Sequence, residues 1–344
     1  MQKLRTGIVG TGKMGLLHSG IFNSLEKSKL SAISEKKKII VNPLKKYLPN
    51  VNVYQNYEEM LEKEDLDIVV VTTPVFLHKK IIENSMKYNH NIFVEKPLAI
   101  NAIECKSLLN KQYKSKTMVG YCRRFMETYK LAKKIIKNSI LGSVNKFQSH
   151  LFVGWVFKQG KGWLYNPKTS GGGVLMDLGS HSIDLFHFLF GDIETVNVFA
   201  KSIYNKDVED YVSAKICFKN NITGSLELSW SIGDYRLPEF KIEIQLDKGV
   251  IIVTEKYIKI YSEKKTDFIK KGWNTYYKQD LTKSIPVNLA GSEYTLEDLH
   301  FLDSILENKK TRCNFKEASK TNFVIDKMYT SIKKERSEKI IYEV

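Results

Sequence analysis

The sequence predicts an α/β fold, with an N-terminal doubly wound parallel sheet and a C-terminal α+β domain built on a large, mainly antiparallel, open sheet. An apolar strand runs into a glycine-rich turn at the start, strands and amphipathic helices alternate to about residue 122, and consecutive strands dominate beyond it. Alternation with helices is typical of a parallel sheet, and consecutive strands are typical of an antiparallel one. The 344 residues suit two domains, which we expect at 1–122 and 123–344.

The glycine-rich turn follows the strand Thr6–Val9 with Gly10, Gly12 and Gly15 in GxGxxG spacing. The first glycine permits a tight turn, the second lets backbone approach a pyrophosphate, and the third lets the next helix pack closely on the strand. Unpaired amides at the helix start then face the phosphates. The turn therefore predicts a dinucleotide-binding Rossmann domain. We expect cofactor contacts from Gly10, Thr11, Gly12, Lys13, Met14 and Gly15.

The choice of dinucleotide depends on Glu35, which follows the second strand, Leu30–Ser34. A carboxylate about twenty residues past the last glycine accepts hydrogen bonds from the adenosine ribose and repels a 2′-phosphate. NAD is the expected cofactor. The run Lys36–Lys38 could neutralise a 2′-phosphate, so NADP stays open, although a solvated loop explains these lysines equally well.

The remaining elements follow from hydrophobic periodicity. In the first domain we expect strands at Val51–Tyr54, Ile68–Val71, Asn91–Val94 and Thr117–Tyr121, and helices at Tyr57–Glu62, His78–Tyr88 and Ile100–Lys114. In the second we expect strands at Val144–Phe152, Thr195–Tyr204, Tyr211–Phe218, Ile222–Trp230, Phe240–Leu246, Gly249–Thr254 and Tyr257–Tyr261, with helices at Thr128–Asn138, Gly173–Phe190, Thr295–Asn308 and Phe315–Lys333.

Ligands of doubly wound folds lie outside the carboxyl ends of the parallel strands. Three strand ends are marked by residues suited to binding, and they supply the other expected cofactor contacts. These are Thr72, Thr73, Pro74, His78, Glu95, Lys96 and Arg124.

Lys96 is the most specific candidate among them. Pro97 disfavours the helical conformation at Lys96 and holds it extended at the sheet edge. An ammonium there can donate to a substrate hydroxyl and stabilise a developing alkoxide. A surface lysine in a lysine-rich protein is the alternative, and position alone leaves the two readings about equal.

A second candidate site follows the glycine run Gly171–Gly173, where Asp177 and His181 lie four residues apart on one predicted helix face. Histidine can take a hydroxyl proton near neutral pH, and Asp177 can orient the imidazole or share the hydroxyl. The glycines would let backbone approach a ligand. The alternative is a pair that only supports an amphipathic helix.

Other classes of site are less well supported. Aromatic residues before the glycine run, including Trp163, are candidates for stacking on a sugar, although a partly buried cluster is the commoner outcome. No third ligand at suitable spacing accompanies Asp177 and His181, so no metal is expected. The net charge of +16 comes from lysines spread along the chain without a nucleic-acid-binding motif. With no leader and no long apolar run, we expect a cytoplasmic protein without membrane or nucleic-acid partners.

Five segments in order, GTGKMG, TTPVFLH, VEKPLA, VGYCRRF and DLGSH, resemble the Gfo/Idh/MocA family of sugar and polyol oxidoreductases over nearly the whole chain. The resemblance implies that Lys96, Asp177 and His181 are the catalytic residues. In that family the lysine–proline bond that corresponds to Lys96–Pro97 is often cis. It also implies that the outer face of the C-terminal sheet forms dimers or tetramers. Expected substrate contacts are Lys96, Arg124, Trp163, Asp177 and His181.

The sequence thus predicts an NAD(P)-dependent dehydrogenase that transfers a hydride between nicotinamide and a secondary hydroxyl or ketone of a sugar, inositol or nucleotide sugar. The alternative is a non-catalytic dinucleotide-binding regulator of the same fold, whose signature would be loss of the catalytic residues. Alternation in Ile222–Trp230 gives one apolar face and one polar face. The sheet side not covered by the helices Gly173–Phe190 and Phe315–Lys333 is the expected interface of a homodimer or homotetramer.

Overall fold

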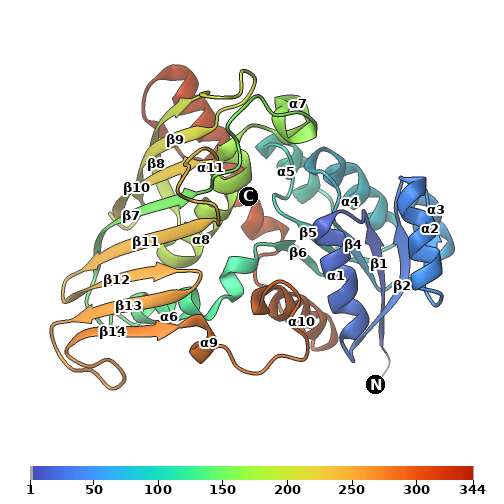
Figure 1. The fold of residues 1–344 in the computed structure, drawn as a ribbon, viewed down its shortest axis with the longest axis horizontal. Coiled ribbons are helices and arrows are strands. Elements are labelled where there is room, and N and C mark those ends of the chain that lie inside the picture. Colours follow the sequence, from blue (N-terminus) through green and yellow to red (C-terminus); the bar gives the residue numbers. More distant parts are fainter. Residues whose placement is uncertain (1–2, 344) are drawn as a thin grey trace. The chain divides into compact units, whose positions relative to one another are not determined.

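The computed structural model describes residues 3–343 as two compact units (Figure 1). The first unit contains residues up to Cys122 together with 284–319, and the second contains 123–283 and 320–343. The junction at Cys122 coincides with the expected domain boundary. The segment 284–319 differs from the expected division because it returns to the first unit.

The first unit is built on a six-stranded parallel sheet in the order β3-β2-β1-β4-β5-β6, which is the Rossmann order. The order reverses between β1 and β4, so their carboxyl ends frame the ligand-binding edge. All four residues of β4 are buried, as expected for a central parallel strand. The strands are β1 Leu4–Val9, β2 Ser28–Ser34, β3 Asn52–Tyr54, β4 Ile68–Val71, β5 Asn91–Glu95 and β6 Thr117–Gly120. The helices are α1 Lys13–Ser24, α2 Lys38–Tyr47, α3 Tyr57–Lys63, α4 His78–Lys87, α5 Ala102–Leu109 and α10 Ser292–Leu306.

The returning segment is attached to the first unit by specific hydrogen bonds. The hydroxyl of Thr311 donates to the carbonyl of Thr117 at 2.6 Å, and the amide of Val119 donates to the carbonyl of Cys313 at 2.9 Å. Lys27 Nζ lies 2.5 Å from Asp303 Oδ1. Both β6 and the end of α1 are therefore held by residues from the far end of the chain.

The second unit is built on a nine-stranded sheet in the order β14-β13-β12-β11-β7-β10-β9-β8-β15. Among the described pairs only β7 and β10 are parallel. The expected fold class is therefore confirmed, while β14 and β15 were not predicted. The strands are β7 Val144–Phe152, β8 Ile193–Lys201, β9 Tyr211–Phe218, β10 Thr223–Ser229, β11 Glu239–Leu246, β12 Gly249–Thr254, β13 Tyr257–Ser262, β14 Gly272–Tyr277 and β15 Glu338–Lys339. The helices are α6 Glu127–Lys137, α7 Pro167–Ser170, α8 Ser180–Phe190, α9 Lys278–Leu281 and α11 Phe315–Lys334, the last of which begins in the first unit.

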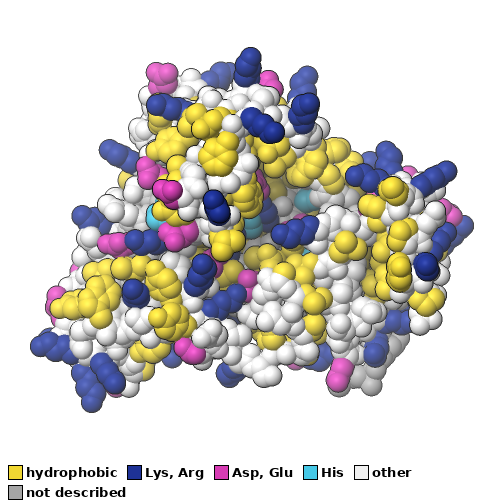
Figure 2. Space-filling view, in the orientation of Figure 1, with side chains coloured by type: hydrophobic (Ala, Val, Ile, Leu, Met, Phe, Trp, Pro, Cys, Tyr) yellow, Lys and Arg dark blue, Asp and Glu magenta, His cyan; other side chains and the backbone are white. Residues whose placement is uncertain are grey.

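The positive charge of the chain is not concentrated on the face drawn in Figure 2. Lys and Arg side chains are spread over that face, with acidic and apolar side chains among them. A nucleic-acid-binding surface would require clustering of these charges along one face or helix.

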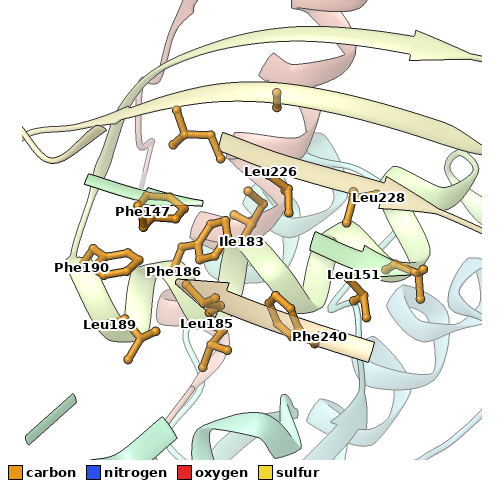
Figure 3. Close-up of a cluster of buried hydrophobic side chains, with 14 of the residues drawn as sticks. Phe147, Leu151, Ile183, Leu185, Phe186, Leu189, Phe190, Leu226, Leu228 and Phe240 are labelled. Carbon is orange, nitrogen blue, oxygen red and sulfur yellow. The ribbon is translucent and has the colours of Figure 1, made fainter. Parts of the chain in front are cut away.

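Helix α8 is fixed by an aromatic core between it and the large sheet (Figure 3). The ring of Phe147 in β7 lies 4.8 Å from Phe186 and 4.7 Å from Phe190, measured between centroids. Leu226 of β10 lies on the same side of the sheet (Figure 3). Residues of α6 and α11 join this core, so the three helices cover one face of the sheet.

The apolar face of β10 is the covered face. Leu226 and Leu228 are buried in the core beneath α8, whereas Ser225 and Glu227 lie on the open face. The face of this strand that the helices leave uncovered is therefore its polar face. The open face carries a group of aromatic side chains at β13 and β14: Tyr257, Tyr261, Trp273 and Tyr277.

Candidate active site

The glycine-rich turn joins β1 to α1 with little room for side chains. Gly10 has a φ of +95°, and a β-carbon on Gly15 would overlap the carbonyl oxygen of Gly10. At Gly12, by contrast, no atom of the described residues outside its own chain neighbourhood lies within 4 Å of the β-carbon position. Gly10 and Gly15 thus shape the turn, while Gly12 leaves open space beside the first amides of α1.

Glu35 is tied to the same turn. Its carboxylate accepts hydrogen bonds from the amide and hydroxyl of Thr11, at 3.0 and 2.5 Å, and from the amide of Lys37 at 2.9 Å. Burial disfavours the charged carboxylate, but these hydrogen bonds prevail and hold the pKa of Glu35 below its usual value. A fixed negative charge therefore lies beside the turn, while the side chains of Lys36–Lys38 are exposed.

The ends of β4 and β5 are linked through His78. Its Nδ1 lies 2.9 Å from the carbonyl oxygen of Pro97, and its Nε2 lies 2.9 Å from that of Thr73. Burial lowers the pKa of His78, and a neutral imidazole donates through one nitrogen only. The contacts assign His78 to holding the two loops, and its direct contact with a cofactor stays a prediction.

The threonines after β4 differ in their contacts. The hydroxyl of Thr72 donates to the carbonyl of Gly10 at 2.7 Å. The buried hydroxyl oxygen of Thr73 has no hydrogen-bond partner within residues 3–343. An unsatisfied buried hydroxyl, open space at Gly12, free first-turn amide positions and the carboxylate of Glu35 together fit the needs of a dinucleotide.

Lys96 is the single accessible residue in a buried stretch. Every residue from Ile92 to Ala99 is buried except Lys96, which is partly exposed. Its amide donates to Glu95 Oε2 at 3.1 Å, and the Lys96–Pro97 peptide bond is cis. The backbone is therefore held at the end of β5, where ligands of this fold bind.

Asp177 and His181 show the same pattern. Every residue from Gly172 to Phe186 is buried except these two. A π-helical turn, Leu175–Gly179, precedes α8 and carries Asp177, and such turns are frequent at functional sites. The two side chains are thus the accessible groups on an otherwise buried segment.

Two aromatic residues define the surroundings of Asp177. The indole Nε1 of Trp230 donates to Asp177 Oδ2 at 3.2 Å, and the ring of Tyr165 lies 5.8 Å from that of Trp230. Burial and then the charge of Asp177 raise the pKa of Tyr165. Sequence reasoning missed Trp230 as a partner of Asp177, since it expected this indole only on the apolar face of a strand.

The glycine run before Asp177 lacks side chains where other parts of the protein pack closely against it. A β-carbon on Gly172 would overlap the Tyr329 hydroxyl, and one on Gly173 would overlap the Glu209 carbonyl. Glu209 Oε1 accepts the amides of Gly173 and Leu175, each at 3.0 Å, and the hydroxyl of Tyr329 at 2.9 Å. The expectation that these glycines admit a ligand is wrong at Gly172 and Gly173, because protein atoms fill the space.

Arg124 and Asp184 form a buried bidentate ion pair in the second unit. Arg124 Nε and Nη2 donate to the two carboxylate oxygens at 2.8 and 2.7 Å. This pair ties the start of the unit to α8. Ligand contact by Arg124 stays a prediction. Trp163, in the turn Trp163–Tyr165, is 44% exposed and remains accessible to a ligand.

The expected catalytic residues belong to both units. Lys96 lies in the first unit, and Asp177 and His181 lie in the second. Over residues 3–343, the structure contains no group of three or more His, Cys, Asp or Glu side chains that could hold a metal ion. In the same range, no helix is both long and apolar enough to cross a membrane.

Comparison with protein families gives two matches to one family. Residues 4–121 match the model described as oxidoreductase family, NAD-binding Rossmann fold, and residues 129–252 match the GFO/IDH/MocA C-terminal domain.

Individual relatives are distant. Levoglucosan dehydrogenase of Pseudarthrobacter phenanthrenivorans is 24% identical over 66% of this chain and 67% of its own length. Myo-inositol 2-dehydrogenase of Thermotoga maritima is 24% identical over 57% of this chain and 58% of its own length. The 2,7-anhydro-N-acetylneuraminate hydratase of Mediterraneibacter gnavus is 26% identical over 73% of this chain and 67% of its own length. Some curated relatives are covered over less than two thirds of their length, down to 54%.

Among solved structures, levoglucosan dehydrogenase in complex with NADH superposes with a TM-score of 0.90 at 22% identity, covering 99% of this chain and 100% of that chain. At this level of identity the likeness establishes the fold.

Replacement of Glu35 tests the choice of cofactor. Glu35→Ser removes the negative charge that would repel a 2′-phosphate and leaves Lys36–Lys38 in place. We expect the preference for NADH over NADPH to fall by about tenfold or more, equivalent to about 1.4 kcal/mol. Fluorescence titration of both cofactors measures it, with the exposed Glu62→Ser as control. Tenfold tighter binding of NADPH by the unaltered protein would contradict our interpretation of Glu35.

Replacement of Arg124 tests the buried ion pair. Arg124→Ala leaves the Asp184 carboxylate buried without its guanidinium, and we expect the free energy of unfolding to fall by about 3–5 kcal/mol. Urea denaturation monitored by tryptophan fluorescence measures the change. Lys219→Ala, which removes an exposed partner of Asp192, should cost about 1 kcal/mol or less. Equal effects of the two variants would rule out the special role of the buried pair.

Proposed function

The chain belongs to the GFO/IDH/MocA oxidoreductase family, and from this we propose that it is an NAD-dependent dehydrogenase acting on a secondary hydroxyl or ketone of a sugar, inositol or nucleotide sugar. The observation that carries the proposal is the accessibility of Lys96, Asp177 and His181. In two long buried stretches, these three side chains are the ones left accessible, and each has chemistry suited to a hydroxyl oxygen.

In this proposal the cofactor is held by the first unit. The amides at the start of α1 bind the pyrophosphate, Glu35 accepts the adenosine ribose hydroxyls, and Thr73 offers an unsatisfied hydroxyl. NAD supplies a hydride acceptor in oxidation and, when reduced, a hydride donor. The protein contributes binding, orientation and movement of the proton.

His181 serves as the acid/base. In oxidation its imidazole takes the proton of the substrate hydroxyl, and in reduction it returns that proton to the carbonyl oxygen. Asp177, fixed by the indole of Trp230, orients the imidazole or shares the hydroxyl. The Lys96 ammonium donates a hydrogen bond to the same oxygen and stabilises the negative charge that develops on it.

A polyhydroxylated ring is the proposed substrate class. Two of the relatives are named for levoglucosan and myo-inositol, both of which carry several ring hydroxyls. Trp163 and Trp155 are 44% and 58% exposed, so both offer faces on which a sugar ring can stack. A cytoplasmic location, and the particular sugar and hydroxyl, stay predictions.

A non-catalytic regulator of the same fold is the alternative. It would need to bind the dinucleotide but would not need accessible Lys96, Asp177 and His181. A panel of polyols, sugars and nucleotide sugars, assayed with NAD and NADP through the absorbance of the reduced nicotinamide, separates the two. Tight cofactor binding without turnover on any of the panel would favour the regulator.

The catalytic assignment predicts two inactive variants that still bind cofactor. Lys96→Ala and His181→Ala should each lower turnover by about 10²–10⁴-fold, the usual contribution of an acid/base group. NADH affinity should change little, since both side chains act on the substrate oxygen rather than on the adenosine half of the cofactor. His150→Ala, a histidine on the sheet outside both buried stretches, is the control. Near-normal turnover by His181→Ala on the true substrate would remove His181 from the mechanism.

We also propose a homodimer or homotetramer that uses the open face of the large sheet. The aromatic residues of β13 and β14 support this, since Trp273 and Tyr277 are 58% and 52% exposed. Light scattering at micromolar concentration should give a dimer or tetramer mass. Trp273→Asp should reduce that mass, whereas Leu237→Asp, on an exposed loop, should not. A monomer mass for the unaltered protein would contradict this proposal.

A further inference from the structure

A buried histidine lies between two carboxylates in the first unit. His18, on α1, has no exposed surface, and its Nδ1 lies 3.0 and 2.9 Å from the two carboxylate oxygens of Asp298 on α10. Its Nε2 lies 3.0 Å from Glu95 Oε1 at the end of β5. Asp298 is also fully buried. Three elements distant in sequence therefore meet at one imidazole ring.

With both carboxylates ionised, this arrangement requires the charged form of His18. Ionised carboxylates only accept hydrogen bonds, and a neutral imidazole carries a single N–H, so both contacts are satisfied only when both ring nitrogens are protonated. Burial opposes the charge, but Asp298 and then Glu95 outweigh it and hold the pKa of His18 well above its usual value. The rings of Phe22, Phe93 and Tyr294 surround the imidazole on the remaining sides.

The cluster continues to the catalytic lysine. Glu95 uses one carboxylate oxygen for His18 and the other, Oε2, for the backbone amide of Lys96 at 3.1 Å. His18 itself lies on α1, the helix that follows the glycine-rich turn. The imidazolium thus lies between the element proposed to bind the cofactor and the residue that carries the catalytic ammonium.

Stability alone is a weak reason for such a cluster. One positive and two negative groups leave an excess negative charge in the interior, and well-packed apolar residues often replace buried ion pairs without loss of stability. What apolar side chains cannot supply is a fixed direction for the Glu95 carboxylate. A site that must hold a lysine to within a fraction of an ångström has that need.

We propose that His18 and Asp298 are positioning residues, which lock Glu95 and through it the backbone of Lys96 at the end of β5. The inference rests on the proposed function in so far as Lys96 is catalytic. Neither His18 nor Asp298 touches the substrate in this scheme. Their effect is on the placement of Lys96.

Asp298→Asn is the test variant, because it keeps the shape of the side chain and removes its charge. We expect kcat to fall about tenfold or more, the scale of a small misplacement of a catalytic group, with the KM for NAD changed less than about threefold. Loss of the Asp298 charge should lower the pKa of His18 relative to the unaltered protein. The activity of the variant should therefore decline as pH rises through that pKa. Asp303→Asn removes the exposed contact of α10 with Lys27 and is the matched control.

Two measurements need no turnover. ¹⁵N NMR of the unaltered protein should show both nitrogens of His18 protonated at about pH 8, well above the ordinary titration of histidine near 6.5. Reductive ¹³C-methylation of the lysines, with the Lys96 signal assigned through Lys96→Arg, should show that signal shifted in Asp298→Asn and unchanged in Asp303→Asn. His18→Gln provides a second variant should Asp298→Asn fail to fold.

The outcomes separate this inference from the proposed function. Ordinary titration of His18, or an unmoved Lys96 signal and unchanged kcat in a folded Asp298→Asn, would overturn the positioning role. A lower melting temperature with normal kcat would assign the cluster to stability alone and overturn it equally. Absence of turnover by the unaltered protein on every substrate, with the NMR results as expected, would count against the proposed function and leave the positioning role supported.

Discussion

The contact between the end of β1 and the start of α1 sets the geometry of the whole first unit. Because only a hydrogen atom fits at Gly15 beside the Gly10 carbonyl, the helix begins directly against the strand. That closeness places Thr11 within reach of Glu35, and Thr72 within reach of Gly10. It also places His18, later on the same helix, between Glu95 and Asp298. Hydrogen bonds from this turn and from α1 thus fix the ends of β2, β4 and β5 relative to one another.

In the second unit, helix α8 and the turn before it are held in place by different contacts. An aromatic core packs α8 against the sheet, the Arg124–Asp184 ion pair ties the helix to the start of the unit, and Glu209 holds the turn before it. The irregular π turn Leu175–Gly179 carries Asp177 itself and changes the phase of the helix before His181. In both units a buried support leaves only Lys96 accessible within Ile92–Ala99, and only Asp177 and His181 within Gly172–Phe186, and precise placement of side chains requires such support.

Local patterns were enough to predict much of this. The Rossmann domain, the antiparallel sheet and the family follow from glycine spacing, strand alternation and short motifs, and the structure and comparisons confirm them. The contacts of Trp230 with Asp177 and of His18 with Asp298 could not be predicted, since they join residues 53 and 280 positions apart. No periodicity encodes such pairs. The glycine run was misread for a related reason, because Tyr329 and Glu209, which occupy the space, lie far away in the chain. Strand β14 was missed because exposed and half-buried residues alternate along it, without a fully buried face.

The return of residues 284–319 to the first unit also bears on how the chain folds during synthesis. A nascent chain that has emerged only as far as Cys122 carries all six strands of the parallel sheet but lacks Asp298, Thr311 and Cys313. His18 and Glu95 would then face each other without the second carboxylate, and β6 would lack its hydrogen bonds to Thr311 and Cys313. Residues 123–283 leave the ribosome before those groups do. The first unit, although it begins the sequence, can therefore complete its fold only after residues 284–319 have been synthesised. Most of the second unit is thus synthesised before the first unit can finish folding.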